Sequence, residues 1–330
     1  MSKHFTIIGV LILLASVFGL GDNCNKKPQN PVNSSDVILV KDSLTNEERL
    51  YIHDKQIYTH GCDTFSQVRF WRKIMNMSSD SGLVSVANSR LTLTDWSSKD
   101  WENNSDECKE EIKTSLKSSY CIPDSTKLYF TSGKNYFYDF NKVYPSLHKA
   151  IKVFQENNTD PWYAQAILLI ESPNKLQKSN VGAYGPFQLM PDVARKFGLI
   201  VNKKIDERAS LERSAYGASS LIKTICIPKT KEALDSLNIP YNETELWFRC
   251  LVMHTYHAGI GNVRPALMAC GVREPGMNLL RKLWFTQAKS FKNSSQAYSQ
   301  LAIAAMLEMD SRVKPFGAIK YRNSQQSNQN

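Results

Sequence analysis

The sequence lacks the patterns that define several common functional classes. None of its seven cysteines forms a CxxC pair, and no histidine stands at ligand distance from a cysteine pair, so the usual zinc motifs are excluded. No internal repeat is visible. The basic residues are scattered, and no aromatic and basic motif for base stacking accompanies them. We therefore expect no metal, no cofactor and no nucleic-acid partner, although the net charge is +10.

The N-terminus carries an apolar run, residues 5–20, that is too short for a comfortable membrane span. Its cationic start and its small residues at the end predict a signal peptide over residues 1–21, and the polar residues 22–36 read as a flexible tether. An alternative is a lipoprotein signal with Cys24 as the lipidated residue, although the residues before it make a poor lipobox. We expect an exported protein, periplasmic or envelope-associated, with an outer-membrane lipoprotein as the second interpretation.

The odd number of cysteines bears on the same question. If Cys24 is lipidated or idle, six cysteines remain, and an oxidising compartment favours disulfides among them. For an exported protein of positive charge, a polyanionic envelope polymer is a better partner than nucleic acid.

One apolar segment organises the rest of the chain. Asp160 followed by Pro161 is a strong helix start, and the apolar residues that follow lead to a single acid, Glu171, just before Pro173. Burial and the negative end of the helix dipole both raise the pKa of such a carboxyl, which is what a general acid needs. From this segment alone, a surface glutamate at a helix end is the commoner interpretation.

Other local signals predict further elements. Alternating residues predict a hairpin of 128–130 with 136–140, and Asn242 with Glu245 resembles a capping box. Ser210 is an expected N-cap for the helix that follows it. Helices are expected at residues 46–58, 65–77, from Pro145 to 156, from Pro191 to 197, at 211–222, 246–258, 262–270 and 295–309.

Three motifs then stand in a fixed order: ES at 171–172, SNVGAYGPFQLMP at 179–191 and YHAGIGNV at 256–263, with DER at 206–208 between the last two. In this order they resemble the soluble lytic transglycosylase domain of the lysozyme-like superfamily, relatives of goose-type lysozyme, over residues 144–309. This chain departs from the family pattern in a shorter segment between Glu171 and Ser179, in His257 where Asn is usual, and in Phe187.

The resemblance implies a mainly α fold, with a lysozyme-like helical catalytic domain over residues 144–322. A mixed α/β accessory region of unknown function would precede it at 37–143, and a polar tail would follow at 323–330. Glu171 would be the single catalytic acid and base. The substrate-binding residues carried over from the motifs are Ser179, Gln188, Met190 and Tyr256.

The implied reaction is cleavage of the MurNAc-β-1,4-GlcNAc bond of peptidoglycan glycan strands, leaving 1,6-anhydro-MurNAc ends. Most glycosidases use paired carboxylates, whereas an intramolecular hydroxyl nucleophile needs only one. Two alternatives stay open: a hydrolytic muramidase or chitinase of the same fold, and a non-catalytic peptidoglycan-binding lipoprotein. The candidates for a second acid in the hydrolase are Asp192, Asp206 and Glu207.

Overall fold

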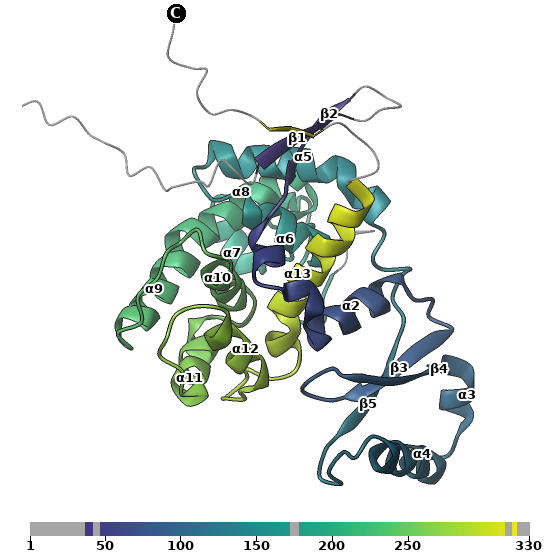
Figure 1. Cartoon of the computed structure of the whole chain (residues 1–330). Helices are drawn as coiled ribbons and strands as arrows, with labels where there is room; N and C mark the ends of the chain where they lie inside the picture. Colours follow the sequence, from purple (N-terminus) through teal and green to yellow (C-terminus); the bar gives the residue numbers. More distant parts are fainter. Residues whose placement is uncertain (1–36, 42–46, 172–177, 314–318, 322–330) are drawn as a thin grey trace, which may run out of the picture.

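A computed structural model describes residues 37–41, 47–171, 178–313 and 319–321, the last for the backbone only. The predicted signal peptide, the tether with Cys24, the polar tail and most of the shortened loop after Glu171 lie outside the described residues. Helices dominate the architecture, which confirms the mainly α prediction (Figure 1).

Helix α6 (Trp162–Glu171) lies at the centre of the helical body. It packs against α5 (Phe140–Glu156), α8 (Leu211–Leu221), α10 (Leu246–Ala258) and α13 (Ser294–Val313). Every residue of α6 before Glu171 is buried. A helix that is apolar on all sides can satisfy its side chains only in the middle of such a bundle. The predicted N-cap is confirmed, because Asp160 Oδ1 accepts from the backbone N–H of Trp162 at 2.9 Å.

The remaining helices line one side of this centre. Helix α8 begins at the predicted N-cap Ser210 and continues through a π-helical turn (Ile222–Cys226) into α9 (Ile227–Asp235). Helix α7 (Pro191–Lys196) starts at the predicted proline, and α11 (Ile260–Cys270) follows α10 directly. Helix α12 (Met277–Phe285) was not predicted from the sequence. The predicted capping box was wrong: Asn242 accepts from Thr244, and α10 begins after Glu245 without a side-chain cap.

The N-terminal strands belong to the same core as the helices. Strands β1 (Val37–Lys41) and β2 (Glu48–Ile52) form an antiparallel sheet with β6 (Ile319–Tyr321) in the order β2-β1-β6. The helix predicted over 46–58 was therefore wrong; only α1 (Gln56–Thr59) is helical there. The side chain of Gln165 explains the strand, because it bonds both the N–H and the C=O of Ile52 at 2.9 Å, as a neighbouring strand would.

A buried ion cluster joins these first residues to the helices. Asp54 accepts from the indole N–H of Trp162 at 2.8 Å, and its Oδ2 lies 3.7 Å from Arg249. The same guanidinium donates from Nε to Asp160 at 2.8 Å. Helix α2 (Ser66–Asn76), close to its predicted bounds, packs on α13.

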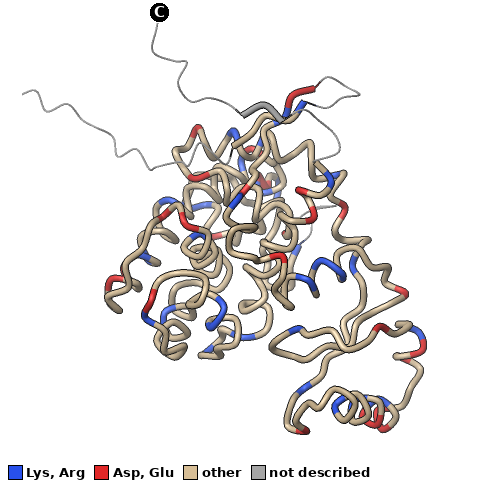
Figure 2. Tube along the Cα trace, in the orientation of Figure 1, with Lys and Arg blue, Asp and Glu red and all other residues tan. Residues whose placement is uncertain are grey.

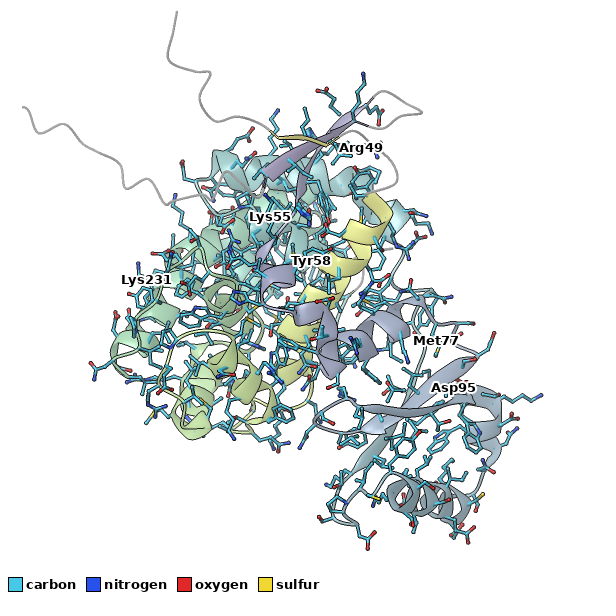
Figure 3. The ribbon with its side chains drawn as sticks, viewed as in Figure 1. Arg49, Lys55, Tyr58, Met77, Asp95 and Lys231 are labelled. Carbon is cyan, nitrogen blue, oxygen red and sulfur yellow. The ribbon has the colours of Figure 1, made fainter. Side chains whose placement is uncertain are left out.

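The part of the chain that follows α2 and precedes α5 forms a second, smaller core. It contains β3 (Ser81–Val86), β4 (Thr92–Ser97), β5 (Leu128–Ser132), α3 (Ser98–Asn103) and α4 (Asp106–Ser119), and the strands follow the order β4-β3-β5. Figure 1 shows this unit to one side of the helical body, and Figure 3 places Met77 at the junction and Asp95 out on β4. The boundary predicted at residue 143 stays a prediction.

The predicted hairpin of residues 128–140 was wrong. Strand β5 pairs with β3 instead, and the backbone N–H groups of Lys134 and Asn135 bond the end of α2 at Ile74 and Met77. Helix α5 then begins after its N-cap Asp139, so Pro145 lies inside the helix instead of opening it.

The charges and cysteines are distributed as follows. Lys and Arg alternate with Asp and Glu over the whole described trace (Figure 2). All six cysteines of the described part are free thiols, against the expectation of disulfides. Burial raises the pKa of Cys62 and of Cys226 to about 12, so both stay protonated in apolar surroundings.

Candidate active site

Glu171 is the last residue of α6. It is half-buried, whereas the residues of α6 before it are buried. Its Oε1 accepts a hydrogen bond from the hydroxyl of Tyr298 at 2.6 Å. Tyr298 belongs to the first turns of α13 and is itself buried. The predicted acid is thus held by a residue far along the chain, on a helix that packs directly against α6.

The environment of Glu171 favours its neutral form. Burial raises the pKa of its carboxyl, and the hydrogen bond from Tyr298 lowers it by a smaller amount. Burial, followed by the charge of Glu171, raises the pKa of three surrounding tyrosines, Tyr138, Tyr256 and Tyr298, so their hydroxyls stay protonated. A carboxyl that keeps its proton among neutral hydroxyls can act as a general acid.

The ring of His257 stacks on the ring of Tyr298. The two rings are stacked with centroids 4.3 Å apart and planes inclined by 19°. His257 is the last-turn residue of α10 and is exposed, although the protein atoms around it lower the pKa of its imidazole by desolvation. The ring therefore stacks as a neutral group near neutral pH and adds no charge beside Glu171.

Ser179 closes the glycine-rich bend that follows the acid in the sequence. The Ser179 hydroxyl accepts from the N–H of Ala183 at 2.9 Å, and the backbone N–H of Ser179 donates to the same residue's C=O at 2.9 Å. Gly182 and Gly185 have φ values of +91° and +88°, which favour glycine. The bend continues through Tyr184, whose backbone pairs with Leu189 in both directions at 3.1 Å.

The buried side chain of Arg208 holds this bend through hydrogen bonds to its backbone. Its buried guanidinium donates to the carbonyls of Gly182 and Leu189, each at 2.9 Å, and forms two bonds with the Asp206 carboxylate. The carbonyl of Arg208 passes so close that a Cβ at Gly185 would lie 1.8 Å from it. The bend is therefore locked to the residues that introduce α8.

The other predicted binding residues lie on or against the same bend. Gln188 has a φ of +47° and donates from its amide to the carbonyl of Gly185 at 3.0 Å. Met190 is exposed and is the N-cap residue of α7. Tyr256 donates to the carbonyl of Phe187 at 2.6 Å, so α10 holds the bend on its second side.

Comparison with known families identifies this region. Residues 148–271 match the family described as the transglycosylase SLT domain. The chain carries an SLT domain. Searches of curated proteins and of solved structures each found no match. The SLT domain is that of the lysozyme-like lytic transglycosylases, and it implies a peptidoglycan-acting function of the lytic transglycosylase type.

Each of the three candidates for a second acid in the SLT domain forms an ion pair with an arginine. Asp206 binds Arg208, and these hydrogen bonds lower the pKa of its carboxyl. Glu207 accepts from the N–H of Ile200, and this bond and one from Arg213 lower its pKa. Asp192 pairs with Arg195 at 2.8 Å on the surface. All three carboxylates pair with arginines, whereas no cation among the described residues forms an ion pair with Glu171.

Sequence reasoning missed Tyr298 and Tyr138 as neighbours of the acid. Both lie outside the residues matched to the family, on the two flanks of the SLT domain. A signal existed for Tyr298, because it is the one aromatic residue in an otherwise small and polar opening turn of α13, residues 294–299. The roles of Ser179 and Arg208 as loop-closing residues also became visible only in the structure.

Among the described residues, no group of three or more His, Cys, Asp or Glu side chains could hold a metal ion. No helix within the described ranges is both long and apolar enough to span a bilayer.

Proposed function

We propose that the protein is a lytic transglycosylase that cleaves the bond between MurNAc and GlcNAc and leaves 1,6-anhydro-MurNAc ends. The observation that supports this most strongly is the state of Glu171. It is the one acid of the site with a raised pKa, it receives a hydrogen bond from Tyr298, and the other candidate acids are bound to arginines.

In the proposed reaction, Glu171 first donates its proton to the glycosidic oxygen. The bond to the MurNAc anomeric carbon breaks, and positive charge develops on the sugar. The Glu171 carboxylate, now stabilised by the Tyr298 hydroxyl, takes the proton from the MurNAc O6 hydroxyl as that oxygen attacks the anomeric carbon. Acid and base are the same residue, because the nucleophile belongs to the substrate and is already in place.

The bend formed by residues 179–190 supports the substrate side of this proposal. Gly182 and Gln188 have positive φ values and are half-buried, so part of the backbone of the bend is accessible to a ligand. The exposed Met190 supplies apolar surface beside it. We assign Ser179 and Tyr256 to holding the bend and Gln188 and Met190 to contacting the glycan.

The decisive experiment is digestion of purified peptidoglycan followed by mass spectrometry of the released muropeptides. Anhydro ends are lighter than hydrolysed ends by one water, so their presence supports the transglycosylase. Reducing ends alone would make the protein a muramidase, and no release by the wild type would support a binding protein. Glu171→Gln should release nothing while keeping the circular dichroism spectrum of the wild type.

We further propose that the protein is exported to the periplasm or envelope, where peptidoglycan is found. Cys24 remains a candidate for lipid attachment. Fractionation of cells with and without Cys24→Ser, followed by detection of the protein in soluble and membrane fractions, tests both parts of this proposal.

A further inference from the structure

A pocket of about 380 Å³ lies between α9, α11 and the turn at residues 288–291. We call it the α9–α11 pocket. Its lining includes three cationic side chains, Lys229, Arg264 and Lys289, and three apolar ones, Ala233, Ile260 and Pro265. A lining of this composition is suited to a ligand that is partly apolar and partly anionic.

The pocket has an excess of positive charge. Lys229 is paired with Glu232, the one acidic residue of the lining, at 2.7 Å. Within the described residues, Arg264 and Lys289 have no ion pair with a carboxylate. Two cations are therefore available to a ligand, and an Arg can bind a carboxylate with two parallel hydrogen bonds.

Lys289 is held in place by the fold. It has a φ of +48° in a tight turn that Ala288 and Phe291 close by bonding each other's backbone at 3.3 and 2.9 Å. Phe291 is fully buried, and the N–H of Ser290 donates to Asn262 of α11 at 3.3 Å. A strained residue anchored on both sides marks a position that the surrounding structure fixes.

Both walls of the pocket are connected to the candidate active site through α10. Ile260 follows His257 by three residues, and the His257 ring stacks on Tyr298, which bonds Glu171. On the other wall, α9 packs against α10, the helix that carries Tyr256 and His257. The α9–α11 pocket is thus built on α10, whose last turn carries the His257 ring that stacks on Tyr298.

We propose that the α9–α11 pocket binds carboxylates of the peptide stem carried by the MurNAc residues. This rests on the proposed function. In peptide-bearing glycan the lactyl carboxyl of MurNAc is an amide, so the sugar chain is neutral and the negative charges lie on the stem. Arg264 and Lys289 bind those carboxylates, and Ala233, Ile260 and Pro265 contact the apolar side chains of the stem.

The test compares wild type with the double variant Arg264→Gln/Lys289→Gln. The probes are GlcNAc–MurNAc disaccharides without a peptide and with the lactyl carboxyl amidated, with a tetrapeptide, and with a tetrapeptide whose carboxylates are amidated. None contains the scissile MurNAc–GlcNAc bond, so calorimetry measures binding to the intact wild-type protein. The matched control is Lys99→Gln/Lys127→Gln, which removes the same charge from exposed residues of the smaller core.

We expect the wild type to bind the tetrapeptide probe more tightly than the other two. The Arg264→Gln/Lys289→Gln variant should weaken tetrapeptide binding about tenfold, with no effect on the peptide-free disaccharide. The control variant should bind all probes as the wild type does. Equal affinity of the wild type for all three probes, or an equal loss in both double variants, would overturn the proposal.

The binding experiment can contradict this proposal without contradicting the proposed function, and the digestion experiment can do the reverse. Loss of stem-peptide discrimination leaves the anhydro ends in the digestion assay unchanged. Conversely, a protein that releases only reducing ends or nothing at all is still tested by the binding measurement, because the probes are not cleaved.

Discussion

Tyr298→Phe tests the assignment of Glu171 as acid and base through one hydrogen bond. The variant removes only the hydroxyl that donates to Glu171 Oε1 at 2.6 Å, and a phenylalanine fills the same buried space. The bond is stronger to a carboxylate than to the neutral acid, so it strengthens as Glu171 releases its proton in the transition state.

The expected loss of turnover follows from the difference in strength between the hydrogen bond to the carboxylate and the hydrogen bond to the neutral acid. A hydrogen bond to a charged group contributes about 1.5–3 kcal/mol, and we expect most of it to appear only as charge develops on Glu171. The turnover number should then fall by roughly 10- to 100-fold in Tyr298→Phe. The remaining activity reflects the burial and position of the acid, which the variant keeps.

The pH profile provides a second signature with a definite sign. The Tyr298 bond lowers the pKa of Glu171 against the larger effect of burial, so its removal raises that pKa further. Activity needs the protonated acid, and it is lost as pH rises through the pKa of Glu171. The alkaline limb of the profile should therefore move to higher pH in Tyr298→Phe.

The assay is release of soluble muropeptides from purified peptidoglycan over a pH series, with thermal denaturation as a folding control. Tyr256→Phe is the matched variant, because it also removes a hydroxyl near the acid, but one that bonds the carbonyl of Phe187. Its alkaline limb should stay where the wild type has it. A Tyr298→Phe profile that does not move, or moves to lower pH, would refute the reasoning.

Three further predictions concern stability. Between its ordinary and its raised pKa, Glu171 binds more protons in the folded than in the unfolded state, so wild-type stability should fall as pH rises through that window, whereas Glu171→Gln should lack this loss in urea denaturation at a series of pH values. Gly185→Ala should cost about 3 kcal/mol because of its φ of +88° and its overlap with the Arg208 carbonyl. Gly198→Ala, with a φ of +78° and nothing within 4 Å, should cost only about 1 kcal/mol, and an equal loss in both would contradict the locked bend. Asp54→Ala should cost about 3 kcal/mol, measured by chemical denaturation, because it leaves the Trp162 N–H and Arg249 with fewer partners in a buried cluster. A near-neutral result would remove the argument that residues 47–59 are part of the helical core.

Local signals in the sequence were enough to predict the main features of the helices that carry the candidate site. Asp160 with Pro161 marks the start of α6, an apolar composition on all sides implies its central burial, and Glu171 stands at its end. The glycine positions of the bend and the start of α7 at Pro191 follow from backbone geometry within a few residues. These predictions succeeded because capping, helix breaking and positive φ act over one turn of chain.

Local signals failed where a distant partner decided the outcome. Residues 48–52 became a strand because Gln165 and β1 offered hydrogen bonds that no helix could match. Strand β5 joined β3 instead of its neighbour in sequence, because the residues after it bond the end of α2.

The sequence by itself therefore determined where α6 begins, that Glu171 stands at its end, and where the glycine-rich bend lies in the chain. Only the tertiary structure supplied the burial that raises the pKa of Glu171, because the helices around it come from distant parts of the chain. It also supplied Tyr298, separated from Glu171 by 127 residues, and Arg208 beneath the bend. Periodicity shows that a face will be buried, but it carries no information on which hydroxyl or guanidinium will meet it there.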